Sequence, residues 1–450
     1  MRLHLLYKTR YCIKKIKLVF LQKSHMLTLQ LIRDNSEFVK ERLQIKNFKN
    51  IGLIDEIINL DNTRRKLQLE RDDAQSEMNS RSKEIGIAMK EKDVAKAELL
   101  KNQTAELKEK IRILNEQHDG IVAEMNNKLI LIPNLPHISV KPGNSADDNE
   151  IVYSEGEMPK LAKDALPHWE LASKYKLIDF ELGVKITGAG FPVYTGLGAR
   201  LQRALIYYFL TEAINAGYIE IQPPLMVNEA SGYGTGQLPD KDGQMYYANE
   251  DNLYLIPTAE VPVTNIYRDV ILKEQDFPVK NVAYSACFRR EAGSYGKDVR
   301  GLNRLHQFDK VEIVQITTPD KSYDVLEEMR SHVASLIRNL GLPFRILRLC
   351  GGDISFTSAL TYDFEVYSAA QQKWLEVSSV SNFESFQANR MKLRYKDAEG
   401  KTMLAHTLNG SALALPRIVA ALLENNQTPD GIIIPKVLTS FMGTEIIKQL

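Results

Sequence analysis

The sequence predicts an α+β protein, with a long antiparallel two-helix coiled-coil arm followed by a core built on an antiparallel sheet flanked by helices. Two observations predict this fold. Residues 53–127 contain almost no Gly or Pro and repeat apolar residues at heptad spacing. From about residue 160 onward, short strand-like runs with turn signals alternate with helical patterns such as 198–215 and 322–340.

The composition bears on two questions: whether the chain spans a membrane and which redox compartment suits it. The chain is 44% hydrophobic and 26% charged, and no stretch of 18 uninterrupted apolar residues is present, so the sequence predicts no membrane span. Cys12, Cys287 and Cys350 lie far apart and form neither a CxxC signature nor a disulfide framework. This cysteine usage fits a reducing cytosol, and we expect a cytoplasmic protein.

The first 25 residues differ in charge from the rest of the chain. They hold seven Lys/Arg and no acid, whereas the net charge of the whole chain is only +1. A targeting segment and an extension upstream of a start at Met26 are both compatible with this composition. The extension is favoured, because a regular pattern opens at Met26. We therefore expect an extension (1–25), a helical arm domain (26–135), a linker (136–160) and a larger domain (161–450).

Two heptad seams define the arm. The first consists of Leu53, Ile57, Leu60, Arg64, Leu67, Arg71, Ala74 and Met78, and the second of Leu107, Ile111, Leu114, His118, Ile121 and Met125. A turn is expected between Gly86 and Asp93, which gives helices of roughly 45 Å. Such a hairpin serves either as a dimerisation coil or as a lone arm. Arg64 and Arg71 favour a lone arm with a hydrated interface, and His118 is expected to be packed.

A charged hairpin is the first stretch that suggests chemistry. Residues 284–291 and 305–316 are strand-like and are joined by a glycine-rich loop. Strand alternation puts Arg289 and Glu291 on one face and Arg290 on the other. Phe308 and Glu312 share a face of the second strand, so the hairpin suits a charged, planar ligand. The alternative is a solvated hairpin with surface ion pairs, and the RxE pattern alone does not exclude it.

Oxygen-bearing side chains recur in two further stretches. In residues 375–382, alternation puts Glu376, Ser378 and Val380 on one face, and carboxylate and hydroxyl oxygens are ligands that suit Mg²⁺. An exposed edge strand is the alternative for this stretch. Residues 257–260 form a polar group after the strand expected at 252–256.

The stretch 406–424 predicts a strand that ends at Asn409-Gly410-Ser411, followed by a long apolar helix. Pro416 suits the first helical position, and Arg417 then falls in the first turn, where the helix dipole favours an anion such as a phosphate. The GxG sequences at 188–190 and 196–198 both lack the third glycine of a GxGxxG motif, and no GxxxxGK[ST] motif is present. A Rossmann or P-loop nucleotide site is therefore disfavoured.

Together and in order, these stretches resemble the bacterial-type seryl-tRNA synthetases, which are class II aminoacyl-tRNA synthetases. The resemblance covers about residues 26–450 and is carried by PTAEVPVTN (257–265), FRREAGSYGKDVRGLNRLHQFDKVE (288–312), LEVSSVSN (375–382) and HTLNGSALAL (406–415). It implies a class II synthetase catalytic core in residues 161–450. The family usually has Gly before the arginine at 417, where this chain has Leu415-Pro416.

The resemblance also implies roles for individual residues. Arg289, Glu291 and Arg417 would be catalytic. The ATP-binding positions would be Arg289, Arg290, Glu291, Phe308, Glu376, Val377, Ser378, Ser379 and Arg417, although alternation turns Arg290 away from the site. The Mg²⁺ ligands would be Glu376 and Ser379. The serine pocket would consist of Thr258, Ala259, Glu260, Glu312, Asn409 and Ser411.

The implied reaction is activation of L-serine with ATP to seryl-adenylate and transfer of serine to the 3′ end of tRNA(Ser), with tRNA(Sec) as a second candidate substrate. The arm would grip the tRNA, and Pro224 in a motif 1-like segment implies a homodimer. Three alternatives are a non-catalytic paralogue, an amino-acid:carrier-protein ligase and a coiled-coil scaffold. The presence of Arg289, Glu291, Glu376 and Arg417 disfavours the first, the long arm disfavours the second, and the core motifs disfavour the third.

Overall fold

The computed structural model describes residues 28–240, 243–291 and 300–449. The chain divides into two compact units, Leu27–Leu135 and the remainder from Pro136 onward. Among the described residues, no helix combines the length and the apolar character needed to cross a membrane.

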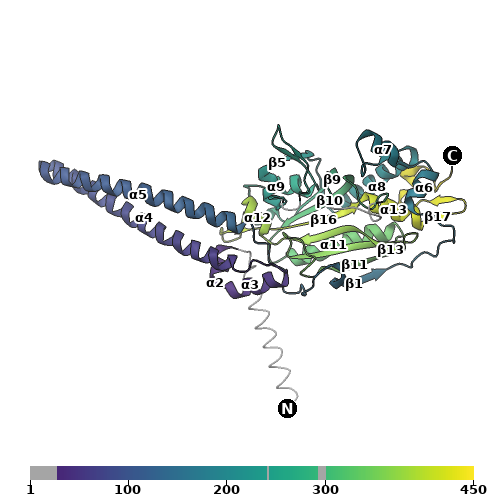
Figure 1. Ribbon diagram of the computed structural model, residues 1–450, viewed down its shortest axis with the longest axis horizontal. Helices are drawn as coiled ribbons and strands as arrows, with labels where there is room; N and C mark the ends of the chain where they lie inside the picture. The colour runs from purple at the N-terminus through teal and green to yellow at the C-terminus, as the bar shows by residue number, and fades with distance from the viewer. Residues whose placement is uncertain (1–27, 241–242, 292–299, 450) are drawn as a thin grey trace, which may run out of the picture. The chain divides into compact units, whose positions relative to one another are not determined.

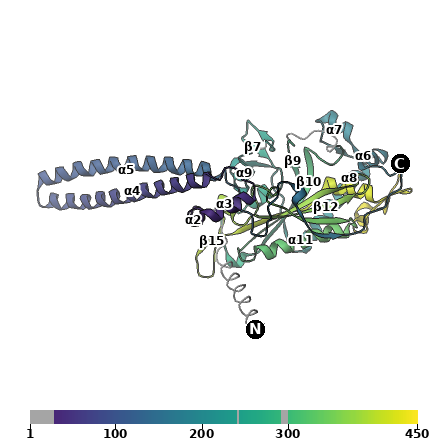
Figure 2. The ribbon, with the colours of Figure 1, turned by 60° about the horizontal axis from the view of Figure 1, so that its bottom comes forward.

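The first unit is helical and is dominated by a hairpin. Helices α4 (Leu53–Lys90) and α5 (Val94–Leu129) lie side by side and antiparallel (Figures 1 and 2), after the short helices α2 (Leu29–Asp34) and α3 (Ser36–Ile45). Helices of 38 and 36 residues span about 55 Å at 1.5 Å per residue. The side chain of Asp93 caps α5 by accepting a hydrogen bond from the Lys96 amide.

The turn between the two helices begins later in the chain than expected. Gly86 lies inside α4, which continues to Lys90, so the hairpin is longer than the 45 Å expected. A glycine costs a helix only about 1 kcal/mol, which the rest of a long helix offsets. The seam itself is partly hydrated as expected. The side chains of Arg64 and Arg71 are 24% and 30% exposed, and Arg64 pairs with the buried Asp61 at 2.8 Å.

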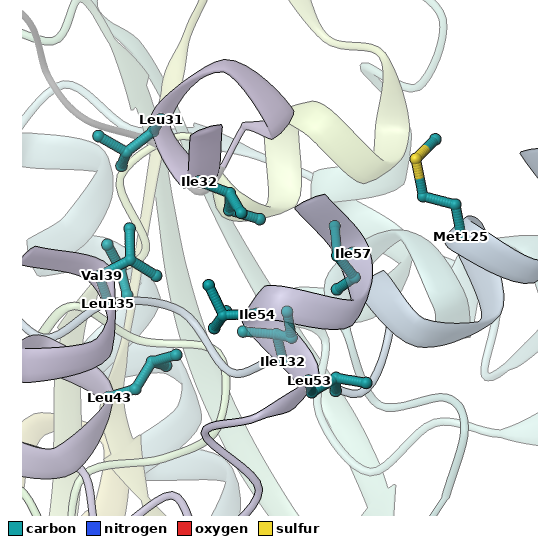
Figure 3. Close-up of a cluster of buried hydrophobic side chains, with 10 residues drawn as sticks. All are labelled: Leu31, Ile32, Val39, Leu43, Leu53, Ile54, Ile57, Met125, Ile132 and Leu135. Atoms are coloured by element: carbon teal, nitrogen blue, oxygen red, sulfur yellow. The ribbon is translucent and has the colours of Figure 1, made fainter. Parts of the chain in front are cut away.

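Ten buried apolar side chains hold the base of the hairpin against α2 and α3 (Figure 3). They come from both short helices, from the ends of α4 and α5, and from the segment after α5: Leu31, Ile32, Val39, Leu43, Leu53, Ile54, Ile57, Met125, Ile132 and Leu135. Farther out, the apolar contact is narrower, with Ala74, Ala88, Ala97, Leu100, Leu107 and Leu114 as the buried apolar side chains of the two helices. The base of the hairpin is therefore its most strongly packed part.

The second unit is built on an eight-stranded sheet in the order β1-β11-β12-β13-β16-β10-β9-β4. All its pairs are antiparallel except β4 with β9. The strands are β1 (Glu150–Glu155), β4 (Ile219–Glu220), β9 (Val279–Phe288), β10 (Gln307–Thr317), β11 (Phe344–Arg348), β12 (Leu360–Ser368), β13 (Lys373–Asn382) and β16 (His406–Ala414). The antiparallel core and the flanking helices are as the sequence predicts.

Three long helices pack on this sheet: α8 (Gly196–Asn215), α11 (Ser322–Asn339) and α13 (Leu415–Asn425). The shorter helices are α6 (His168–Lys174), α7 (Phe180–Ile186), α9 (Glu229–Thr235), α10 (Glu260–Asn265), α12 (Phe386–Met391) and α14 (Thr439–Met442). The smaller sheets use β2 (Ile178–Asp179), β3 (Val193–Tyr194), β5 (Met226–Asn228), β6 (Tyr247–Ala248), β7 (Leu253–Leu255), β8 (Ile271–Lys273), β14 (Arg394–Lys396), β15 (Thr402–Leu404), β17 (Gln427–Thr428), β18 (Gly431–Ile433) and β19 (Ile446–Ile447).

Two expectations about the sheet need correction. Strand β1 lies within residues 136–160, where a linker was expected, and it forms one edge of the sheet by pairing with β11. The stretch 375–382 is not an edge strand, because β13 lies between β12 and β16. Its polar side chains therefore lie over the interior of the sheet rather than along its edge.

Candidate functional site

The hairpin of β9 and β10 forms in the expected place, with Phe308 opposite Cys287 and Glu312 opposite Ala283. The expected alternation of side chains between the two faces of the strand does not continue beyond residue 288. Strand β9 ends at Phe288, and Glu291 adopts a left-handed backbone with φ of +48°. Simple alternation therefore does not apply to Glu291. The following residues 292–299, which include Gly293 and Gly296 of the expected loop, lie outside the described part of the chain.

The two neighbouring arginines have different environments. Arg289 is partly buried, its guanidinium lies 5.2 Å from the centre of the Phe308 ring, and its Nε donates to the carbonyl of Pro257 at 3.4 Å. Arg290 is exposed, and its backbone N–H donates to Gln244. Glu291 accepts a hydrogen bond from Arg304 at 3.0 Å. The pair Arg289 and Phe308 thus forms a surface suited to a flat ring with an attached anion.

A cluster of buried polar side chains lies over β10 and β16. Glu312 is 2% exposed and faces Ser411 across the two strands. One of its oxygens accepts a hydrogen bond from the Thr258 hydroxyl at 3.3 Å and lies 2.6 Å from Nζ of Lys310. Ala259 is fully buried next to Thr258. The register and these contacts bring the residues expected for the serine pocket to one place.

Glu260 supplies a second buried carboxylate, at the start of α10. Its Oε1 accepts a hydrogen bond from Nε2 of Gln387 at 2.6 Å, and Gln387 is itself held by the hydroxyl of Thr407 at 2.7 Å. Burial and the negative charge of Glu312 raise the pKa of Glu260 to about 7. The buried side chain of Asn409 lies close enough to interact with Glu260, and this interaction lowers the pKa of Glu260 in part. The cluster therefore holds a carboxylate whose charge depends on its polar neighbours.

Arg417 lies in the first turn of α13, with Pro416 at the helix start, as expected. Its Nη1 donates to the backbone carbonyl of Glu376 at 2.8 Å and lies 3.7 Å from the Glu376 carboxylate. The strand before it is longer than expected, because β16 continues to Ala414. Asn409 and Ser411 consequently lie within a strand rather than at its end.

A β-bulge changes which side chains of β13 share a face. Between β12 and β13 the register shifts, so that Phe364 faces Ser378 while Glu365 faces Glu376, and Val377 is the additional residue. The expectation that Glu376 shares a face with Ser378 and Val380 is therefore wrong. Glu376 instead shares its face with Ser379, and both line a cleft of about 650 Å³.

The side chains of Val377 and Ser378 point away from this cleft. The Ser378 hydroxyl is buried and donates to the backbone carbonyl of Ser411, and the side chain of Val377 is 1% exposed. Neither side chain lines the cleft. Any contribution of these two residues to ligand binding is therefore through the backbone or through packing.

The oxygens of Glu376 and Ser379 fit a Mg²⁺ ion that arrives with phosphates. The Glu376 side chain is 51% exposed, and both groups are hard oxygen ligands in one cleft. No cluster of three or more His, Cys, Asp or Glu within the described part of the chain is arranged to hold a metal alone. Two protein oxygens would leave most positions on the ion to phosphates and water, which is how Mg²⁺ is commonly held beside nucleotides.

Comparisons with known proteins assign the chain to a family. The family model for the seryl-tRNA synthetase N-terminal domain matches residues 26–136, and the model for the class II tRNA synthetase core domain (G, H, P, S and T) matches residues 244–426. The Serine–tRNA ligase of Salinibacter ruber is 51% identical over 93% of this chain and 98% of its own length. The chain belongs to the seryl-tRNA synthetase family. The Serine–tRNA ligase of Akkermansia muciniphila is 45% identical over 94% of this chain and 99% of its own.

Solved structures of other family members have the same fold as this synthetase. The seryl-tRNA synthetase from Pyrococcus horikoshii, complexed with ATP, superposes with a TM-score of 0.85 at 31% identity, covering 94% of this chain and 100% of that one. The cytoplasmic serine–tRNA ligase from Naegleria fowleri, in complex with AMP, gives a TM-score of 0.86 at 27% identity, over 94% and 99% of the two chains. The similarity therefore extends over nearly the whole chain.

Sequence reasoning missed two side chains of this cluster of buried polar groups. Lys310 lies two residues before Glu312 on the same face of β10, so alternation together with the rarity of a buried lysine could have identified it. Gln387 comes from α12, far from the pocket in sequence, and no local pattern marks it. Both side chains compensate buried carboxylates, which would otherwise be costly to ionise.

The raised pKa of Glu260 predicts a pH-dependent stability. The folded chain binds the proton of Glu260 up to a pH of about 7, whereas the unfolded chain releases it near pH 4.5. The free energy of unfolding should therefore decrease, through this group, as pH rises from about 4.5 to about 7. Denaturant unfolding without serine should show that Glu260→Gln gains stability relative to wild type over this range. A difference between the two proteins that does not change with pH would contradict the assignment.

Proposed function

We propose that this serine–tRNA ligase activates L-serine with ATP and transfers the seryl group to tRNA(Ser). One observation carries the proposal. Glu312 and Phe308 lie on the same strand, β10, and Arg289, just after β9, contacts the Phe308 ring, so an amino acid and a nucleotide bound there would have their reacting groups next to each other. Holding two reactants in this way supplies much of the catalysis that such a reaction needs.

In the first step, a carboxylate oxygen of serine attacks the α-phosphorus of ATP, and the bond to the β-phosphate breaks to release pyrophosphate. Arg289 would stabilise the charge that grows on the α-phosphate, while Phe308 stacks on the adenine. Arg417, in the first turn of α13, would hold the leaving pyrophosphate with help from the helix dipole. Phosphoryl transfer of this kind needs no protein nucleophile.

Glu376 and Ser379 would hold Mg²⁺ at the edge of the cleft. When bound, the ion would neutralise charge on the phosphates. In the second step, the 3′-terminal ribose hydroxyl of the tRNA attacks the acyl carbon, its proton is released, and AMP leaves.

Selection of serine would depend on its hydroxyl group. We infer that the hydroxyl binds at Glu312 and the ammonium group near Glu260, with Thr258 and Ser411 completing the pocket. Alanine would leave the Glu312–Lys310 pair facing an unfilled, desolvated space, which disfavours it strongly. The serine ammonium would also favour the ionised form of Glu260, whose pKa is raised in the free protein.

The other parts of the chain have proposed roles as well. The hairpin of α4 and α5, in the domain 26–135, would bind the tRNA, and residues 161–450, together with the edge strand β1, would form the catalytic domain. A homodimer, a cytoplasmic location and tRNA(Sec) as a second substrate are further proposals. Cys287 and Cys350 are free thiols, which is compatible with a reducing compartment.

Pyrophosphate exchange tests the first step directly. Labelled pyrophosphate should enter ATP only when serine is present, and the other amino acids, including alanine and threonine, should support little exchange. The control is the reaction without an amino acid. Exchange that does not depend on serine would contradict the proposed function.

The neighbouring arginines provide a matched pair of variants. Arg289→Ala should reduce serine-dependent exchange by about 10²–10³-fold, because a charge aimed at the reacting phosphate is lost. Arg290→Ala should change it by less than about threefold, because the exposed Arg290 side chain makes only weak contributions. Equal losses in the two variants would show that Arg290 also contacts the nucleotide.

The arm can be shortened without touching the core at its base. Replacing residues 66–117 by a short Gly-Ser turn leaves the ten side chains of Figure 3 in place. Exchange should stay near the wild-type rate, whereas charging of tRNA(Ser) should fall about a hundredfold or more, equivalent to roughly 3 kcal/mol of lost binding. Loss of exchange with retained charging would refute the proposed division of roles.

A further inference from the structure

A buried polar network lies beside the site and has no part in the reaction described above. It centres on His168 of α6 and Glu424 of α13, whose side chains are both fully buried. Nδ1 of His168 lies 2.8 Å from Oε1 of Glu424, and the backbone N–H of His168 donates to the same oxygen at 2.9 Å. The other oxygen, Oε2, accepts hydrogen bonds from the Ser368 hydroxyl and from the backbone N–H of Gln371.

These contacts show that Glu424 is the anion of the network. Burial opposes its charge, but the hydrogen bonds from His168 and Ser368 more than offset burial and hold the pKa of Glu424 below its ordinary value. A fully satisfied buried carboxylate fixes the positions of all its donors. His168 is thus held from one side by a rigid group of α13.

The other side of the imidazole contacts the end of the glycine-rich loop. Nε2 of His168 accepts the backbone N–H of Leu302 at 2.9 Å. Because an amide N–H can only donate, Nε2 must carry no proton, and the ring proton lies on Nδ1, facing Glu424. His168 is therefore a neutral bridge between a carboxylate and a loop backbone.

Gly301 fits tightly against this bridge. Its φ is +68°, and a Cβ atom there would lie 2.3 Å from Nε2 of His168. Any other residue would be strained and would displace the ring or the loop. The loop end and the imidazole are therefore fitted to one another from both sides.

Asn303 and Arg304, which follow Leu302, contact two residues of the proposed ATP site, Arg417 and Glu291. The carbonyl of Asn303 accepts a hydrogen bond from Nε of Arg417 at 3.1 Å, and its Nδ2 donates to Gln371 at 3.0 Å. Arg304 pairs with Glu291 at 3.0 Å. A shift of the backbone at 302–304 would consequently move Arg417 and Glu291 together.

We propose that His168 is a positioning residue for ATP binding: with Glu424 it fixes the backbone of residues 301–303, and through Asn303 and Arg304 it sets Arg417 and Glu291 in place for the nucleotide. This inference rests on the proposed ATP site. Without the bridge, ATP must order this segment as it binds, and the cost appears as weaker ATP binding. Serine binding should be little affected, because the bridge makes no contact with Glu312 or Thr258.

Two substitutions of His168 separate positioning from general stability. The amide nitrogen of an Asn side chain falls near Nδ1, so His168→Asn keeps the donor to Glu424 and loses the acceptor for Leu302. The carbonyl oxygen of a longer Gln side chain reaches the place of Nε2, so His168→Gln keeps the acceptor for Leu302. Both variants lose the ring and should lower the melting temperature by similar amounts.

The measurement is serine-dependent pyrophosphate exchange at varied ATP and serine concentrations. His168→Asn should raise KM for ATP about tenfold, as expected for the loss of one buried hydrogen bond, with KM for serine nearly unchanged. His168→Gln should restore KM for ATP toward the wild-type value. Amide hydrogen exchange at Leu302 should be faster in His168→Asn than in His168→Gln.

Equal KM values for ATP in the two variants would overturn the proposal, as would a parallel rise of KM for both substrates. If His168→Asn does not fold, Gly301→Ala decides, since it displaces the same contact from the loop side. It should raise KM for ATP and leave KM for serine unchanged, and an unchanged KM for ATP would overturn the proposal. Serine-dependent exchange by the wild-type enzyme tests the proposed function separately, so a failure of that function can be distinguished from a failure of this inference.

Discussion

The site depends on the pairing of β10 with β9 on one side and β16 on the other. This register places Glu312 opposite Ser411 and Phe308 opposite Cys287. A slip of one residue would turn each of these side chains to the other face of the sheet. Within β10, the ammonium of Lys310 lies 2.6 Å from the Glu312 carboxylate and compensates its buried charge, and removing either partner would leave an unpaired buried charge that costs about 3–5 kcal/mol.

The groups around this strand come from segments that are far apart in the chain. Thr258 and Glu260 approach from the loop and helix after β7, Gln387 comes from α12, and Arg417 comes from α13. Each is tied to a neighbour by a hydrogen bond, so little rearrangement is needed when a ligand binds. Such preorganised groups stabilise developing charge more effectively than mobile ones.

Much of this arrangement follows from sequence patterns, and the exceptions have physical causes. Heptads predict the hairpin of α4 and α5, and Pro416 predicts the place of Arg417 in the first turn. Alternation fails on β13, because the bulge at Val377 depends on the pairing partner and leaves no local sequence signal. That bulge is why Ser379 rather than Ser378 lies beside Glu376.

Other features could not be predicted from the sequence, because they depend on contacts beyond the local stretch. Gly86 looks like a helix end, but the packing of a long hairpin outweighs its weak propensity. Glu291 looks like a strand residue, but β9 ends at Phe288 and the backbone of Glu291 is left-handed. His168 and Glu424 are 256 residues apart. Contacts of such separation depend on the whole fold and not on any local stretch.

A crystal structure with a non-hydrolysable seryl-adenylate analogue would test the central claim most directly, which is that β10 joins the serine pocket to the nucleotide site. The account predicts the seryl hydroxyl within hydrogen-bonding distance of Glu312, the adenine stacked on Phe308, and the phosphate mimic against Arg289. An analogue bound away from β10, or with its seryl group directed away from Glu312, would contradict it.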